Sequence, residues 1–197
     1  SVFFKQFNAD INLQKLTDNT SMYTIEPPCG SNIFILHSKK KLLFIDTGFA
    51  IYAKEMMDIF LNLFPDFQDM EKSILLTHAD IDHCGLLSVL KDAKIIVNKK
   101  TAMGLHNQSD GIADYREQNK YCLGYSRLSR IFSGYTPINN SRFLEIIDKA
   151  TPENHDDLLY IGDVSFEDIT FKVYEGSGGH VYGEVIFLCE NPKIVFT

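Results

Sequence analysis

The stretch SILLTHADIDHCGLL, residues 73–87, decides how this sequence is interpreted. A short apolar run is followed by four side chains that can ligate a metal within six positions, namely His78, Asp80, Asp82 and His83. Alternate side chains of an extended backbone share a face, so residues 78, 80 and 82 would lie together while His83 points elsewhere. This geometry predicts two neighbouring metal ions, with His78 and Asp80 serving one and Asp82 and His83 the other.

A second interpretation of the same residues needs no metal. Asp is a common helix N-cap, so Asp82 would begin a helix over residues 83–91 and His83 would be exposed. Carboxylates beside an apolar strand are costly unless a cation or a donor satisfies them. Four candidate ligands followed by Gly85 are more than a helix cap requires. We therefore favour a metal site, at which ions such as Zn²⁺ accept imidazole and carboxylate together.

Short strands and two helices are predicted around this stretch, and one of the helices spans residues 83–91 and starts inside the ligand cluster. Residues 73–78 form a continuous apolar run, which is typical of a strand buried on both faces. Apolar residues at helical spacing over residues 50–64, ended by Pro65, predict a helix. This alternation predicts layered α/β packing. Further strands are predicted at residues 2–7, 21–26, 31–37, 41–46, 94–98, 158–168, 169–176, 184–190 and 193–197.

Residues 99–157 have a different character, with helical stretches, many tyrosines and no strand pattern. The segment is longer than an ordinary connection, so we expect a helical insert within a single domain of residues 1–197. Its aromatic side chains would either form a substrate lid or simply pack a small helical subdomain. The lid candidates are Tyr115, Tyr121 and Tyr125, together with Phe132, Tyr135 and Phe143.

The composition narrows the class of partner. A net charge of −7 over 197 residues disfavours nucleic acid, because phosphate binding needs a basic face. We find no apolar run long enough to span a bilayer and no signal-peptide pattern. The four cysteines show no paired spacing, which suits reduced thiols. We therefore expect a cytoplasmic protein with a small-molecule substrate and no membrane partner, and a homodimer stays open.

Four stretches of the sequence resemble the motifs of one protein family. THADIDHCG, residues 77–85, resembles the metal-binding loop T-H-x-H-x-D-H-x-G of the metallo-β-lactamase superfamily. GSNIFILHSKKKLLFIDTG, residues 30–48, resembles its opening strand pair and Asp-Thr-Gly turn, and GSGGHVYGEVIFL, residues 176–188, its Gly-His segment. KIVFT, residues 193–197, is similar to the strand that precedes a Gly-Asp with a bridging carboxylate.

The resemblance implies a four-layer αββα sandwich with a dinuclear site at one edge. His78, Asp80 and His180 would hold the first ion, and Asp82 and His83 the second. Asp46 would orient these ligands through hydrogen bonds, as metal sites generally require; alternatively, it only forms the Asp-Thr-Gly turn. The implied cofactors are two divalent ions, with zinc foremost.

The sequence departs from the superfamily pattern at two places. Asp80 stands where the hydrolases usually have His, and a carboxylate shifts the preference toward iron or manganese. The sequence also ends at Thr197, before the bridging Asp and the last metal-binding His of the pattern. We therefore expect a chain truncated in its C-terminal half.

Three functions remain open from the sequence. The first is metal-dependent hydrolysis, in which a metal-bound hydroxide attacks an ester, thioester, lactone or phosphodiester and Asp82 steers the proton. The second is a diiron redox or oxygen-binding protein related to the flavodiiron proteins, suggested by Asp80. The third is a binding module that kept the fold without catalysis. Cys84 is expected to pack beneath the site, and His37, His106 and His155 match no motif.

Overall fold

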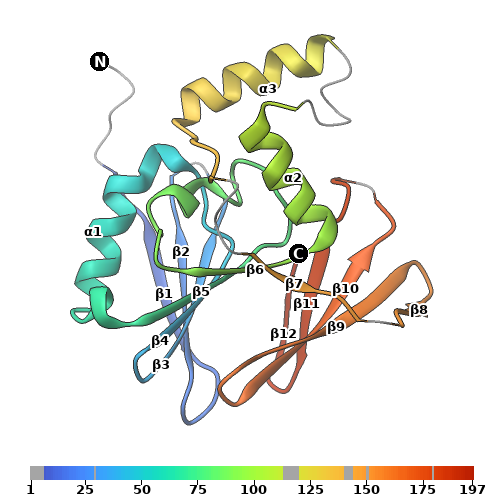
Figure 1. Ribbon diagram of the computed structural model, residues 1–197. Coiled ribbons are helices and arrows are strands. Elements are labelled where there is room, and N and C mark those ends of the chain that lie inside the picture. The colour runs from blue at the N-terminus through green and yellow to red at the C-terminus, as the bar shows by residue number, and fades with distance from the viewer. Residues whose placement is uncertain (1–6, 29, 113–119, 140–143, 150, 179) are drawn as a thin grey trace.

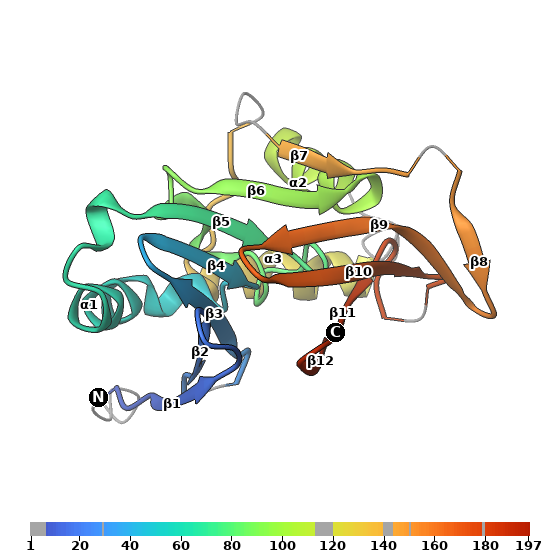
Figure 2. The same ribbon diagram turned by 90° about the horizontal axis from the view of Figure 1, so that it is seen from below.

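Two β-sheets packed face to face form the centre of the molecule, and helices lie against the outer face of the first sheet (Figures 1 and 2). The computed structural model describes residues 7–28, 30–112, 120–139, 144–149, 151–178 and 180–197, without the side chain of His155. The mixed α/β sandwich predicted from the sequence is confirmed. The described residues supply three of the four expected layers, namely helices, sheet and sheet.

The first sheet has seven strands in the order in which they occur along the chain. Its first four strands are antiparallel, whereas the last three join in parallel, so the ends of β4, β5 and β6 lie at one edge. The strands are β1 (Asp10–Lys15), β2 (Ser21–Glu26), β3 (Ile33–Ser38), β4 (Lys41–Ile45), β5 (Glu71–Leu75), β6 (Lys94–Asn98) and β7 (Leu144–Ile147).

The second sheet is antiparallel and has five strands in the order β12-β11-β10-β9-β8. Its strands are β8 (Glu153–His155), β9 (Leu158–Phe166), β10 (Ile169–Gly176), β11 (Val185–Glu190) and β12 (Lys193–Phe196). A main-chain bond from Val185 N–H to the carbonyl of Thr77, at 2.9 Å, ties the start of β11 to the chain just past β5. The two sheets therefore meet at the edge where the parallel strands end.

Two hydrophobic cores follow from the alternation of side chains along the central strands. In β4, Phe44 packs in the core between the first sheet and the helices, whereas Leu43 packs between the two sheets. Phe60 of α1 meets Phe44 with ring centroids 5.3 Å apart. The helical segments are η1 (Ala50–Tyr52), α1 (Ala53–Leu63), η2 (Phe67–Asp69), η3 (Gly85–Ser88), α2 (Lys99–Asp110) and α3 (Lys120–Ser133).

Some details of the sequence prediction were wrong. Residues 83–91 contain only the short 3₁₀ helix η3, not a helix capped by Asp82. Residues 99–157 contain α2 and α3 but also β7 and β8, which belong to the two sheets. The predicted strand at residues 2–7 falls mostly outside the described residues, and β1 was not predicted.

Helix α3 turns most of its apolar residues to solvent. Ser133 is its one buried residue among those described, and its half-buried residues are Leu123, Ser126, Ser129 and Arg130. Its large exposed side chains are Tyr121, Tyr125, Leu128, Ile131 and Phe132. No described helix is long and apolar enough to cross a bilayer.

Candidate metal centre

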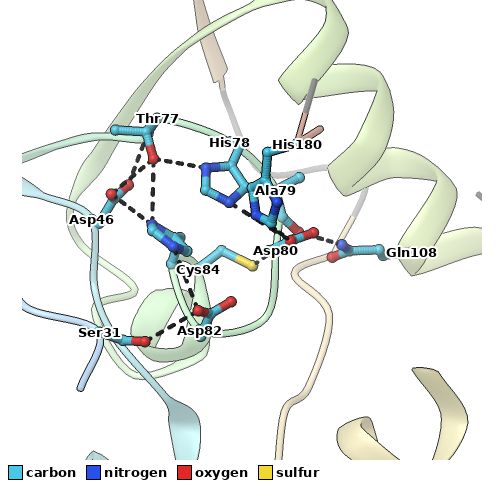
Figure 3. Close-up of polar contacts among 11 residues, drawn as sticks. Ser31, Asp46, Thr77, His78, Ala79, Asp80, Asp82, Cys84, Gln108 and His180 are labelled. Carbon is cyan, nitrogen blue, oxygen red and sulfur yellow. Dashed lines mark hydrogen bonds and ion pairs between the residues drawn. The ribbon is translucent and has the colours of Figure 1, made fainter. Parts of the chain in front are cut away.

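The candidate ligands lie in a turn directly after β5. The backbone N–H groups of His83 and Cys84 both donate to the carbonyl of Asp80, at 2.9 and 3.0 Å. This turn brings His83 back over His78, so that their ring centroids are 4.0 Å apart. The predicted residues from 78 to 83 therefore converge, although the backbone is turned where we had pictured it extended (Figure 3).

Three side chains form a compact group of potential ligands. Asp80 Oδ2 lies 3.7 Å from His78 Nε2 and 3.5 Å from His180 Nε2. One ligand atom from each residue lies within 4.8 Å of the others. His180 comes from the segment between β10 and β11, about a hundred residues further along the chain, and points toward the same carboxylate (Figure 3). The two sheets thus bring together residues that are far apart in sequence.

One ring nitrogen of His78 is held by a hydrogen bond, and the other is available as a ligand atom. Its Nδ1 is paired with Thr77 Oγ1 at 2.9 Å, whereas its Nε2 is buried and has no hydrogen-bond partner among the described residues. A buried nitrogen without a partner is costly. Burial lowers the pKa of His78, and the neighbouring His83 lowers it further. A neutral imidazole with a free nitrogen facing a carboxylate is the form that ligates metals, so this group fits a divalent ion.

Asp82 and His83 form a second pair beside this group. His83 Nε2 lies 3.5 Å from Asp82 Oδ2, which also accepts a hydrogen bond from Ser31 Oγ at 3.1 Å. Asp82 is about one-third exposed, with a side-chain exposure of 33%. The pair offers two donor atoms to a second ion. A tightly bound ion usually has at least three ligand atoms from protein, so this pair alone offers too few.

Asp46 connects both histidines to one carboxylate. Its Oδ1 accepts the backbone N–H of Thr77 at 2.9 Å, and its Oδ2 accepts Thr77 Oγ1 at 2.8 Å and contacts His83 Nδ1 at 2.8 Å. Burial disfavours the charged form of His83, but the hydrogen bond and charge of Asp46 outweigh it, so the pKa of His83 is raised. Thr77 was missed in the sequence because it matches no ligand type.

A sequence profile described as the metallo-beta-lactamase superfamily matches residues 27–197. The chain belongs to this superfamily. No curated protein matches the chain at a significant level. The superfamily includes both metal-dependent hydrolases and flavodiiron proteins, so membership alone does not choose between them.

Solved structures of superfamily proteins share the fold at low identity. A metallo-beta-lactamase from Pontibacter korlensis is 16% identical over 95% of this chain and 70% of its own, with a TM-score of 0.53. A class B3 di-zinc metallo-beta-lactamase from an Alaskan soil metagenome is 20% identical over 90% of this chain and 56% of its own, with a TM-score of 0.58. A flavo di-iron protein variant from Thermotoga maritima is 16% identical over 92% of this chain and 40% of its own, with a TM-score of 0.53. The chain therefore spans between 40% and 70% of the length of these proteins.

The Asp-Thr-Gly turn of the superfamily interlocks with the ligand turn through the backbone. Thr47 N–H and Oγ1 both donate to the carbonyl of His83, at 2.7 and 3.0 Å, and Gly85 N–H donates to the carbonyl of Gly48 at 2.9 Å. A Cβ atom at Gly85 would overlap the Gly48 carbonyl oxygen and the amide nitrogen of Ala50. Gly85 is therefore required for the two turns to touch.

Residues from the 99–157 segment support the ligand turn from behind. Gln108 Nε2 donates to the carbonyl of Ala79 at 2.6 Å, and Tyr135 OH donates to Gln108 Oε1 at 2.6 Å. Cys84 Sγ lies 3.4 Å from Tyr135 OH, and burial raises the pKa of Cys84 to about 12. The predicted position of Cys84 beneath the site is therefore observed. Tyr135, proposed as a lid residue, is instead buried in this support.

The remaining lid residues have mixed outcomes. Tyr121 and Tyr125 project from α3 with three-quarters of their surface exposed, and Phe132 is similarly exposed. Tyr115 and Phe143 lie outside the described residues. His37 and His106 are half-buried, rather than fully exposed. A role of α3 over the substrate stays a prediction.

Proposed function

We propose that this chain binds two divalent metal ions and belongs to an enzyme that hydrolyses an ester, thioester, lactone or phosphodiester. The observation that carries the proposal is the buried Nε2 of His78, which has no hydrogen-bond partner among the described residues and faces Asp80. A hydrogen bond to protein would have been the ordinary way to satisfy that nitrogen. A cation shared with Asp80 and His180 would satisfy it and offset the charge of the half-buried Asp80 carboxylate.

The two ion positions differ in the number of donors. His78, Asp80 and His180 would hold the first ion through three atoms, and Asp82 and His83 would hold the second through two. The first ion should therefore bind more tightly. Zinc is the leading candidate because it accepts imidazole and carboxylate together.

The chain's own residues have defined roles in this proposal. When bound, a divalent cation lowers the pKa of water and polarises a carbonyl or phosphoryl oxygen. Asp46 holds His83 through Nδ1, which leaves Nε2 toward Asp82. Ser31 and His83 both contact Asp82 Oδ2, and no described residue donates a hydrogen bond to Oδ1, so Oδ1 would accept a proton at the partly exposed rim. Asp82 is thus the proposed proton acceptor.

A diiron redox protein is the second candidate, and Asp80 favours it. A carboxylate among the ligands adds charge and oxygen donation, which iron and manganese prefer over zinc. The similarity in fold to the Thermotoga maritima flavo di-iron protein, at 16% identity, is compatible with this reading but does not select it.

The test is metal analysis combined with assays of turnover. The protein is purified anaerobically, its metals are measured, and turnover of ester, thioester, lactone and phosphodiester probes is assayed with zinc, manganese and iron. We expect colourless protein with zinc and hydrolysis of at least one probe. Stoichiometric iron with visible absorption would favour the redox reading. Bound metal without turnover of any probe, in the parent and in Asp80→His, would indicate a binding module.

A further inference from the structure

The segment that carries His180 is fastened at one point to the beginning of α2. The carbonyl of Gly183 accepts hydrogen bonds from Asn98 Nδ2 at 2.9 Å and from Thr101 Oγ1 at 3.3 Å. Gly183 has φ = 89° and packs against the Cβ of Lys100, so no side chain fits there. The backbone of this segment therefore approaches α2 as closely as a glycine allows.

The side-chain amide of Asn98 joins α2 to the segment that carries His180, and both its oxygen and its nitrogen form hydrogen bonds. Its Oδ1 accepts the N–H of Thr101 at 2.8 Å and so caps α2. Its Nδ2 donates to Glu175 Oε2 at 2.7 Å as well as to Gly183. Asn98 is 1% exposed, and a buried amide with every group satisfied is rigidly placed.

Glu175 completes the connection from the other end of the segment. It is the next-to-last residue of β10, and only 8% of it is exposed. Its Oε1 accepts from Lys100 Nζ at 2.5 Å, so the buried carboxylate is compensated by a charge as well as by Asn98. Lys100 Nζ in turn lies 4.5 Å from the ring centroid of Tyr182. Both ends of the loop between β10 and β11 are thus joined to α2.

His180 lies on an exposed part of this loop. Its side chain is 60% exposed, and it lies two residues after Gly178, whose φ is 110°. Other anchors of the loop are the backbone bonds from Gly176 to Glu184 at 3.0 Å and from Val185 to Thr77 at 2.9 Å. A ligand on such a loop is positioned only as well as the loop is held.

We propose that Asn98 and Glu175 are positioning residues, which fix the His180 loop so that the imidazole faces Asp80. The proposal rests on the proposed function in so far as His180 ligates the first ion. It assigns a task to two residues that lie outside the metal-binding motifs. It also explains why α2 begins at Lys99, directly after β6, because the side chain of Asn98 both caps the helix and holds the loop.

The experiment separates the role of Asn98 as the N-cap of α2 from its hydrogen bonds to Glu175 and Gly183. Ser and Asp are both good N-caps, so Asn98→Ser and Asn98→Asp keep α2 capped but remove both amide donors, and Asp adds a charge beside Glu175. The matched control is Thr20→Val. It removes a part-buried hydrogen bond from Thr20 Oγ1 to Asp168, at 2.8 Å, just before the opposite end of β10. Two quantities are measured in each full-length variant: zinc affinity by chelator competition, and amide hydrogen exchange of residues 177–184 in metal-free protein.

We expect Asn98→Ser to lower zinc affinity by about tenfold, the usual range for a residue that orients a ligand, and Asn98→Asp to lower it further. Both should speed hydrogen exchange of residues 177–184, whereas Thr20→Val should change neither quantity more than about twofold. Unchanged exchange in both Asn98 variants would overturn the proposal, and so would zinc affinity equal to that of the control. A further outcome is that the parent binds no zinc while residues 177–184 still exchange faster in the Asn98 variants. That outcome would support the role of Asn98 in fixing the loop and contradict the proposed function.

Discussion

Asp46 Oδ2 lies 2.8 Å from His83 Nδ1, and this contact determines that Nε2 of His83 faces Asp82 in the candidate centre. The same carboxylate accepts two hydrogen bonds from Thr77, whose hydroxyl is paired with His78. One buried side chain therefore orients an imidazole in each half of the candidate centre. The arrangement matches the general rule that groups behind the ligands set ligand orientation.

Replacing this carboxylate by an amide tests that relationship. In Asp46→Asn the remaining oxygen can still accept from Thr77, but the amide NH₂ cannot accept from His83. We expect metal affinity to fall by about 10- to 100-fold and stability to fall by about 1–3 kcal/mol, because a buried partner is left unsatisfied. Chelator competition and urea unfolding measure the two effects. An affinity within twofold of the parent would contradict the role of Asp46.

His180→Ala distinguishes a ligand from a structural residue. Because His180 is 60% exposed, its removal should change the stability of metal-free protein by less than about 0.5 kcal/mol. In the parent, zinc at a hundred times its dissociation constant should add about 2.7 kcal/mol. That increment should be lost in the variant at the same zinc concentration. Thermal unfolding with zinc and with chelator gives both numbers, and a retained increment would exclude His180 as a ligand.

Gly85→Ala should be one of the most damaging single changes in the chain. The added methyl group would overlap backbone atoms of Gly48 and Ala50, which cannot move aside as a side chain would. We expect a loss of about 3 kcal/mol or more, together with loss of metal binding. Gly124→Ala is the control, because Gly124 lies in α3 with no atom within 4 Å of an added Cβ.

That control should stabilise the protein by about 0.5–1 kcal/mol, the usual preference for Ala over Gly inside a helix. Urea unfolding of both variants makes the comparison. Equal stability of the two would mean that the ligand turn and the Asp-Thr-Gly turn are not in contact in solution.

Cys84→Ala should keep metal binding and turnover. Cys84 is fully buried and its neighbours are Tyr135 and the carbonyl of Ala79, so the thiol fills space behind the ligands. A loss of about 1–2 kcal/mol in stability is expected from the smaller side chain. Turnover and metal content are measured beside unfolding. Loss of turnover with metal still bound would instead make the thiol a participant in the reaction.

The exposed aromatic residues of α3 offer a test of the lid. Tyr121→Ala and Tyr125→Ala should leave stability within about 0.5 kcal/mol, because both side chains are three-quarters exposed. If α3 covers the substrate, KM should rise for the substrate that is turned over while metal content stays constant. An unchanged KM in the double variant would remove these residues from the lid.

Much of the fold could be predicted from the sequence because its central strands have strong patterns. β2, β4, β6 and β10 agree with the predicted ranges to within one residue. β4 and β6 are largely continuous apolar runs, whereas β2 and β10 mix apolar and polar residues, and all four are bounded by polar residues or turns. β1 was missed because only two of its six residues, Ile11 and Leu13, are apolar, and all six are exposed. β7 and β8, at four and three residues, are too short to show a period.

The wrong helix at residues 83–91 has a specific cause. The backbone amides at its expected start are already engaged, because His83 and Cys84 both donate to the carbonyl of Asp80 in a turn that begins before residue 83. Leu86 N–H then donates to Thr47 Oγ1 at 3.1 Å. Contacts with the Asp-Thr-Gly turn, 36 residues away in one case, thus decide the local backbone, and a local pattern cannot contain that information.

Residues of the candidate site could be predicted only where their side chains are of types that commonly ligate metals. His78, Asp80 and His180 were proposed as ligands of one ion, and the structure brings these three together. The supporting residues Gln108 and Asn98 were missed, because a buried amide has no signature in a sequence. Only the packing of α2 against the ligand turn and the His180 loop reveals them.

The bond between Val185 and Thr77 has a consequence for the order of assembly. Residues 78–83 and His180 cannot meet until the second sheet has docked on the first, a closure over about a hundred residues of chain that is slow to find. On the proposed function, metal binding at His78, Asp80 and His180 would therefore follow the docking of the two sheets, and a chain during synthesis would complete this ligand group only after β11 has been made.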